Sequence, residues 1–116
     1  MRAPQGDRPL LVQFCANDPA TLLAAAKLVE GQCDAVDLNL GCPQRIAKRG
    51  NYGAFLMDDL ERVRAMVEAL SKNLSVPVSV KARCQQGIAC GIFALTVARR
   101  RSASFRSLRR RLRTRA

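Results

Sequence analysis

Residues 34–43 read DAVDLNLGCP, and this stretch decides the fold. Its first seven residues predict a strand, and the Gly-Cys-Pro that follows predicts that this strand ends in a loop. Two further strands are predicted, one from the apolar run PLLVQF (9–14) and one from VPVSVKA (76–82). The chain is therefore expected to contain three short strands.

Helical patterns fill the two intervals between these strands. Asp18 followed by Pro19 is typical of a helix start, and the good helix formers after it continue to Gly31, a natural stop. A second helix is expected from near Asp58, with Glu61 at capping-box spacing, whereas residues 41–53 are expected to form a loop. Its apolar face is predicted to comprise Leu60, Val63, Met66, Val67 and Leu70.

Strands that alternate with helices predict an α/β fold with a parallel sheet and right-handed crossovers. Three strands are compatible with an open doubly wound sheet and with an arc of a (β/α)8 TIM barrel. Because a complete barrel takes roughly 250 residues, a chain of 116 residues could form only part of one, about three strand–helix units.

The charge is distributed unevenly along the chain. Residues 1–83 carry 11 basic and 9 acidic side chains, whereas residues 84–116 carry nine arginines and no acidic residue. We therefore divide the sequence into an N-terminal extension (1–7), an α/β fragment (8–83) and an Arg-rich tail (84–116). The tail is expected to be solvated and mostly disordered; the alternative is a surface that binds nucleic acid or a membrane.

Composition excludes several classes of protein. The sequence lacks an apolar stretch of ~18 residues and a secretory signal, so no membrane span or secretion is expected. Its five cysteines lack CxxC spacing and are accompanied by no histidine, which argues against a metal site and against a disulfide framework. Free thiols in the cytoplasm or nucleus are expected, each by default a small buried apolar residue.

Polar side chains stand where the three strands end. Gln13 ends the first strand, Asn39 the second, and Lys81 with Arg83 the third, with Cys42 just beyond Asn39. Functional groups of parallel α/β proteins cluster at this edge, so Cys42 is a candidate for proton donation or nucleophilic attack. Taken singly, the thiol could instead be structural, the amide a solvated strand end and the ammonium part of a surface salt bridge.

The central motif resembles a known family. NLGCP (39–43) followed by AKRGNYGAFL (47–56) is similar to the signature of the tRNA-dihydrouridine synthases. LVQFCANDP (11–19) resembles the eukaryotic tRNA-dihydrouridine(16/17) branch, and VPVSVKAR (76–83) resembles the next barrel strand. The resemblance covers residues 8–83.

This resemblance implies an FMN-binding TIM barrel in which NADPH is the reductant and the C5=C6 bond of a D-loop uridine in tRNA is reduced. It implies that Cys42 donates the proton to C5. Gln13 and Lys81 would contact the flavin ring, and Asn39 would hold the uracil. Arg83, Lys48 and Arg49 would lie on the substrate side, the last two against the RNA backbone.

The chain departs from the family pattern in several respects. It has no histidine, although the family places a catalytic-site histidine after the lysine strand, and it matches only three of eight strands. We therefore expect a truncated chain that is inactive alone. The alternatives are a non-enzymatic product whose Arg-rich tail binds RNA without sequence preference, and a generic α/β binding module. The oligomeric state is left open.

Overall fold

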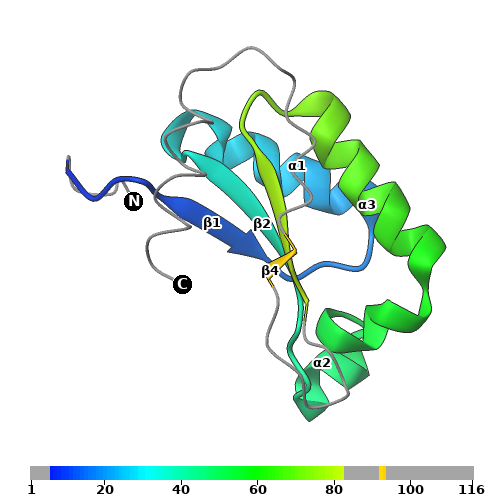
Figure 1. The fold of residues 1–116 in the computed structure, drawn as a ribbon. Helices are drawn as coiled ribbons and strands as arrows, with labels where there is room; N and C mark the ends of the chain where they lie inside the picture. The colour runs from blue at the N-terminus through cyan, green and yellow to red at the C-terminus, as the bar shows by residue number, and fades with distance from the viewer. Residues whose placement is uncertain (1–5, 83–91, 94–116) are drawn as a thin grey trace.

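Three parallel strands in chain order form the centre of the structure. The computed structural model describes residues 6–82 and 92–93, and its sheet has the order β1-β2-β3-β4 (Figure 1). The three expected strands are confirmed, each beginning one or two residues later than the apolar runs suggest. They are β1 (Leu11–Phe14), β2 (Ala35–Leu40) and β3 (Val78–Ala82).

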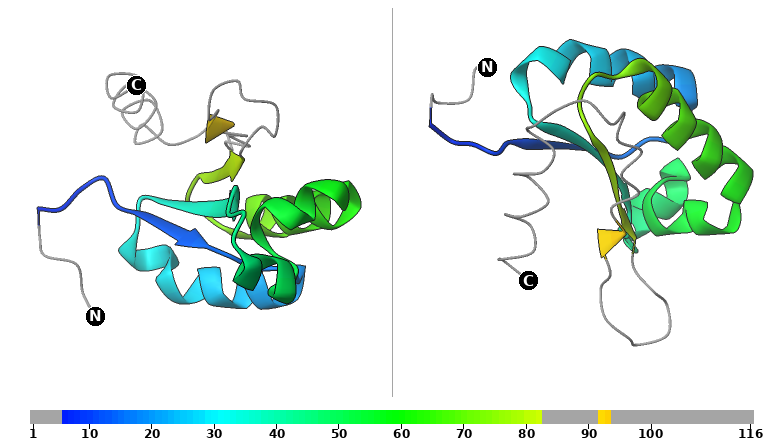
Figure 2. Two further views of the ribbon diagram at one scale, coloured as in Figure 1. Left: turned by 90° about the horizontal axis from the view of Figure 1, so that it is seen from below. Right: turned by 45° about the horizontal axis from the view of Figure 1, so that its top comes forward.

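Helices α1 (Pro19–Val29) and α3 (Leu60–Asn73) cover one face of this sheet (Figure 2). They contribute buried side chains that pack against the inward side chains of β2 and β3. Side chains alternate between the two faces along each strand, so Val36, Leu38 and Leu40 of β2 and Val78 and Val80 of β3 reach this face together. The largest side chains of this core are Leu22, Leu38, Leu40, Leu56, Met66, Leu70, Val36 and Val78.

The start of α1 follows the sequence prediction. The Asp18 carboxylate accepts hydrogen bonds from the Thr21 backbone N–H at 2.8 Å and from the Thr21 hydroxyl at 2.7 Å, and Pro19 is the first helical residue. These hydrogen bonds lower the pKa of Asp18 below its usual value. The helix therefore begins where its capping residues predict.

The start of α3 differs from the sequence prediction. The N-cap is Asp59, whose side chain accepts a hydrogen bond from the Arg62 N–H at 3.1 Å, and not Asp58. Asp58 still belongs to the preceding 3-10 helix, η2 (Gly53–Asp58), which ends in a bond from the Asp59 N–H to the Leu56 carbonyl. Leu60, expected on the apolar face, is 67% exposed because the core lies against the later turns of the helix.

The segment expected to be a loop contains a further helix, α2 (Arg45–Gly50). It ends at Asn51, whose backbone is left-handed with φ 52°, and the Asn51 N–H caps the helix carbonyls. This helix has only one buried residue, Ala47, so it shows no apolar periodicity that could have predicted it.

Within the segment 84–116, Ile92–Phe93 forms a short strand, β4, antiparallel to β3. These two residues pair with the edge that β3 offers; the prediction of a mostly disordered tail is otherwise untested. The rest of that prediction, with Arg83, lies outside the described residues. Among residues 6–82, no helix has the length and apolar character needed to cross a bilayer.

Glu30 connects the end of α1 to the turn before β3. Its carboxylate accepts hydrogen bonds from the Ser75 backbone N–H and hydroxyl, and Lys27 Nζ lies 3.0 Å away. The hydrogen bond from the Ser75 N–H, helped by those from Lys27 and the Ser75 hydroxyl, lowers the pKa of Glu30 from 4.5 to about 2. The ionised carboxylate thus stabilises the fold at the amino-terminal edge of the sheet.

We expect Glu30→Gln to lower the free energy of unfolding by about 1–2 kcal/mol at pH 7. The folded pKa lies below the unfolded one, so this stabilisation is present above about pH 5 and is lost as the pH falls toward 2. Urea unfolding of both proteins at several pH values between 3 and 7 measures the difference, which should shrink in acid.

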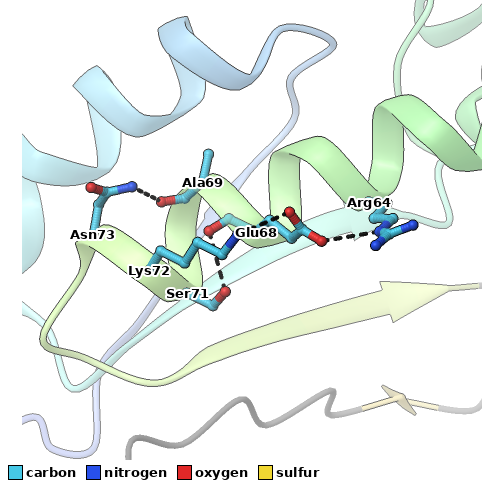
Figure 3. A network of polar contacts seen from close by, with 6 residues as sticks. All are labelled: Arg64, Glu68, Ala69, Ser71, Lys72 and Asn73. Atoms are coloured by element: carbon cyan, nitrogen blue, oxygen red, sulfur yellow. Dashed lines mark hydrogen bonds and ion pairs between the residues drawn. The ribbon is translucent and has the colours of Figure 1, made fainter.

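Glu68→Gln is the matched control. Glu68 lies on α3 between Arg64 and Lys72, and Figure 3 shows that its ion pairs stay within one helix. Its side chain is 43% exposed and its ion pairs are screened by water, so its substitution should have little effect on the free energy of unfolding. Equal losses for the two variants would contradict the role assigned to Glu30.

Candidate active site

The face of the sheet opposite α1 and α3 is polar. Strand register places Gln13 beside Asp37, Asp37 beside Ser79, and Asn39 beside Lys81. Residues at register positions two apart on parallel strands share a face, so all five side chains lie on the side that α1 and α3 do not cover. The polar strand ends predicted from the sequence are thus brought together.

Hydrogen bonds connect four of these side chains. Gln13 Nε2 donates to Asp37 Oδ2 at 2.6 Å, and Ser79 Oγ donates to the other oxygen of Asp37. Asn39 Nδ2 donates to Gln13 Oε1 at 3.2 Å. Two amides from neighbouring strands are therefore held side by side at the carboxyl end of the sheet.

Cys42 lies three residues beyond Asn39 and is connected to this network through its neighbour. The Gly41 N–H donates to Asn39 Oδ1 at 2.8 Å, which fixes the residue before Cys42 against the sheet. The Cys42 carbonyl accepts from the Ala54 N–H at 3.0 Å. The half-buried Cys42 is thus held at the end of β2 by backbone contacts on two sides.

Gly53 permits the close approach of the two chain segments at Cys42. Its φ is +66°, and a Cβ built at this position would lie 2.8 Å from the Cys42 carbonyl oxygen. Any side chain at residue 53 would therefore be strained and would push the Cys42 loop away.

The cysteines do not share one environment. Cys33 is buried, as expected, whereas Cys15 is exposed, contrary to the default prediction for a small apolar residue. Desolvation raises the pKa of the Cys15 thiol, and the neighbouring Cys42 side chain raises it further. Cys15 follows β1 as Cys42 follows β2, so a second thiol lies near the proposed reactive one.

Three exposed basic side chains lie near the carboxyl end of the sheet. Lys81 is exposed on β3, and α2 lies beyond the strand ends with Lys48 and Arg49 exposed on it (Figure 1). Arg83 lies outside the described residues. The sequence prediction of a common rim holds for Gln13, Asn39 and Lys81.

Sequence reasoning missed Asp37 and Ser79. Asp37 is 5% exposed, although acidic residues are rarely buried without partners. The sequence could have indicated Asp37, because it lies two residues before Asn39 and so on the same face of the strand. Ser79 likewise lies two residues before Lys81. The partner across the strands could not be known without the register.

The arrangement offers hydrogen bonds to a planar polar ring. Residues 6–82 contain no group of three or more His, Cys, Asp or Glu side chains placed to hold a metal. Two amides and an ammonium group offer donors and acceptors to a ring, and a thiol at the same edge can give up a proton.

Comparison with known proteins identifies a single family. The family model described as dihydrouridine synthase (Dus) matches residues 1–100. The tRNA-dihydrouridine(16/17) synthase [NAD(P)(+)] of Saccharomyces cerevisiae is 66% identical over 77 residues, which cover 66% of this chain and 18% of that protein. The corresponding Schizosaccharomyces pombe protein is 51% identical over 77 residues, 66% of this chain and 19% of that protein.

A more distant relative extends the match. The human tRNA-dihydrouridine(20a/20b) synthase [NAD(P)+]-like protein is 39% identical over 107 residues, covering 80% of this chain and 34% of that protein. The chain thus spans less than a fifth of the length of the 16/17 relatives.

Gly53→Ala should destabilise the protein by about 1–3 kcal/mol, because the left-handed backbone and the contact with Cys42 both oppose a Cβ. The displaced loop should also change the rate at which iodoacetamide alkylates Cys42, measured by peptide mass spectrometry. Urea unfolding gives the stability.

Gly31→Ala is the control for this substitution. Nothing lies within 4 Å of a Cβ at residue 31, and its φ is not in the left-handed region. Its stability and Cys42 alkylation rate should match those of the unsubstituted chain. If both alanine variants behave alike, Gly53 does not hold the Cys42 loop.

Proposed function

The chain belongs to the dihydrouridine synthase family, and we propose that it is the segment of a tRNA-dihydrouridine synthase that carries the proton donor, Cys42. Identity with the 16/17 enzymes of two yeasts exceeds that with the human 20a/20b protein, which supports the 16/17 branch. The observation that carries the proposal is the Cys42 thiol at the carboxyl end of β2, beside the paired amides of Gln13 and Asn39.

The proposed fold is an arc of a (β/α)8 barrel. Half of a doubly wound sheet can also have its strands in chain order and two helices on one face. In the complete sheet, however, further helices cover the second face, and the strands are apolar on both faces. Here the second face carries an amide, a carboxylate and an ammonium group, at Gln13, Asp37 and Lys81. A polar inner face that lines a site at the carboxyl ends of the strands supports the barrel.

The residues of this face fit the ring of FMN. Gln13 and Lys81 would hold the ring, since both are exposed on the polar face and offer N–H donors, and the Gln13 oxygen adds an acceptor. When bound, FMN supplies the hydride that it receives from NADPH. The contribution of this chain is to orient the ring against the substrate.

Cys42 would complete the reaction as a general acid. Reduction of the C5=C6 bond leaves carbanion character at C5 once hydride reaches C6, and a thiol in reach of C5 gives up its proton there. Asn39 would hold the uracil by hydrogen bonds, after the base has been turned out of the folded RNA into the site. The hydrogen bond from the Gly41 N–H to Asn39 keeps the Cys42 thiol at a fixed separation from the amide that would hold the uracil.

The substrate proposed is the D-loop of tRNA, approached from the basic rim. Lys48 and Arg49 are exposed on α2, and among residues 6–82 neither takes part in an ion pair. They are therefore free to contact phosphates, which position an RNA without reading its sequence. Arg83 is proposed for the same side on the family resemblance alone.

Cys42→Ala tests the proton donor. In a chimera in which the matched segment of this chain replaces that of the 66% identical S. cerevisiae relative, the variant should form dihydrouridine ~10²–10⁴-fold more slowly, the usual cost of losing a general acid. Reduction of the flavin by NADPH, followed by its absorbance, should continue at the normal rate.

Cys33→Ala is the control, because Cys33 is buried at the other end of β2. It should leave tRNA reduction within about twofold of the unsubstituted chimera. A Cys42→Ala chimera that modifies tRNA at the normal rate refutes the assignment of the acid.

Replacing Lys48 and Arg49 by Gln together should weaken tRNA binding by the full chain. Because the double variant can no longer neutralise two phosphates, the slope of log K against log salt should become shallower by about 1.4–1.8. Filter binding at several salt concentrations measures this slope. The matched control is Gln at Arg64 and Lys72, which removes the same charge from α3; an equal change there would mean that α2 has no particular role.

A further inference from the structure

A buried carboxylate lies beside the proposed ring-binding amides and has no part in the reaction proposed above. Within residues 6–82, Asp37 is the one polar or charged residue that is buried, with 5% of its surface exposed. Its two oxygens accept from two different strands, Oδ2 from Gln13 on β1 at 2.6 Å and Oδ1 from Ser79 on β3. A buried carboxylate is tolerated where such donors replace its water.

Asp37 determines whether the nitrogen or the oxygen of the Gln13 side-chain amide points toward it. A primary amide has a donor end and an acceptor end of nearly equal size, and packing alone does not distinguish them. Beside a carboxylate at 2.6 Å only the NH₂ end is accommodated, because the reversed amide would place two acceptor oxygens in contact. The Gln13 oxygen is consequently turned toward Asn39.

The same constraint passes on to Asn39. Gln13 Oε1 accepts from Asn39 Nδ2 at 3.2 Å, so the Asn39 oxygen is turned away and accepts from the Gly41 N–H at 2.8 Å. Every hydrogen bond from Gly41 to Asp37 therefore runs in one direction, toward the carboxylate. Each amide retains one N–H and one oxygen lone pair for a ligand.

We propose that Asp37 is a positioning residue that fixes the orientation of the Gln13 and Asn39 amides, and with it the donor–acceptor pattern that this face offers to a planar heterocycle. The inference rests on the proposed function, in which the heterocycles are the FMN ring and the uracil. A charged acceptor serves this role better than a neutral one, since hydrogen bonds to it are about twice as strong. It also cannot donate, so it permits only one orientation.

Asp37→Asn in the full chain tests this proposal by NMR of the ¹⁵N-labelled side-chain amides, without cofactor or RNA. An asparagine can donate or accept, so it permits both orientations of Gln13. The Gln13 amide proton that faces residue 37 should exchange with solvent about tenfold faster, and the Asn39 side-chain signals should move with it. Unchanged exchange and unchanged signals would overturn the proposal.

Asp34→Asn is the matched control for a merely structural effect. Asp34 also connects β1 to β2, accepting from the Leu10 N–H at 2.7 Å and from Arg8, but at the opposite end of the strands. It should lower stability without moving the side-chain signals of Gln13 or Asn39. A similar movement in both variants would show that Asp37 acts only through stability.

Ser79→Ala keeps the proposal testable if Asp37→Asn does not fold. It removes the second donor to Asp37 while leaving the charge in place, and the loosened carboxylate should let the Gln13 amide exchange several-fold faster. A folded Ser79→Ala chain with unchanged exchange overturns the proposal. These readouts need no reaction, so they fail independently of the Cys42→Ala result, which tests the proposed function.

Discussion

The alternation of side chains along β2 is the constraint on which the rest of the structure depends. Val36, Leu38 and Leu40 are buried against α1 and α3, and the pleat then sends Asp37 and Asn39 to the opposite face. Apolar burial on one side thus creates the polar surface on the other. A shift of one residue in register would exchange the two faces and destroy core and site together.

The thiol is placed by backbone contacts and not by its own side chain. Cys42 follows β2 directly, its carbonyl is held by the Ala54 N–H, and Gly53 lets that segment approach it closely. A group held by backbone on both sides has few alternative positions, which is the condition for a proton donor to meet one atom of a substrate. Because Cys42 lies only three residues beyond Asn39 of β2, the position of the strand also restricts the position of the loop.

Stability and chemistry are assigned to opposite edges of the sheet. Glu30 and Asp34 tie the amino-terminal ends of the strands through hydrogen bonds that lower the pKa of both carboxyl groups. The carboxyl-terminal edge carries the exposed basic residues of α2 and the thiols of Cys15 and Cys42. Because acidic groups with depressed pKa values stabilise the first edge, the second can carry exposed basic side chains, which the proposed function assigns to RNA binding.

Most of the strands and helices, and the family, can be predicted from the sequence alone. The strands, α1 and α3 follow from apolar periodicity and from a cap such as Asp18, since these signals are local, and the motif around Cys42 identifies the family. The sequence did not predict the cap of α3 correctly, because it does not show that Asp58 still belongs to η2. It did not predict α2, because a helix with a single buried residue, Ala47, has no apolar periodicity. Only the tertiary structure decided that Asp37 lies between Gln13 and Ser79, since their contacts depend on the register of strands that are 24 and 42 residues apart in the chain.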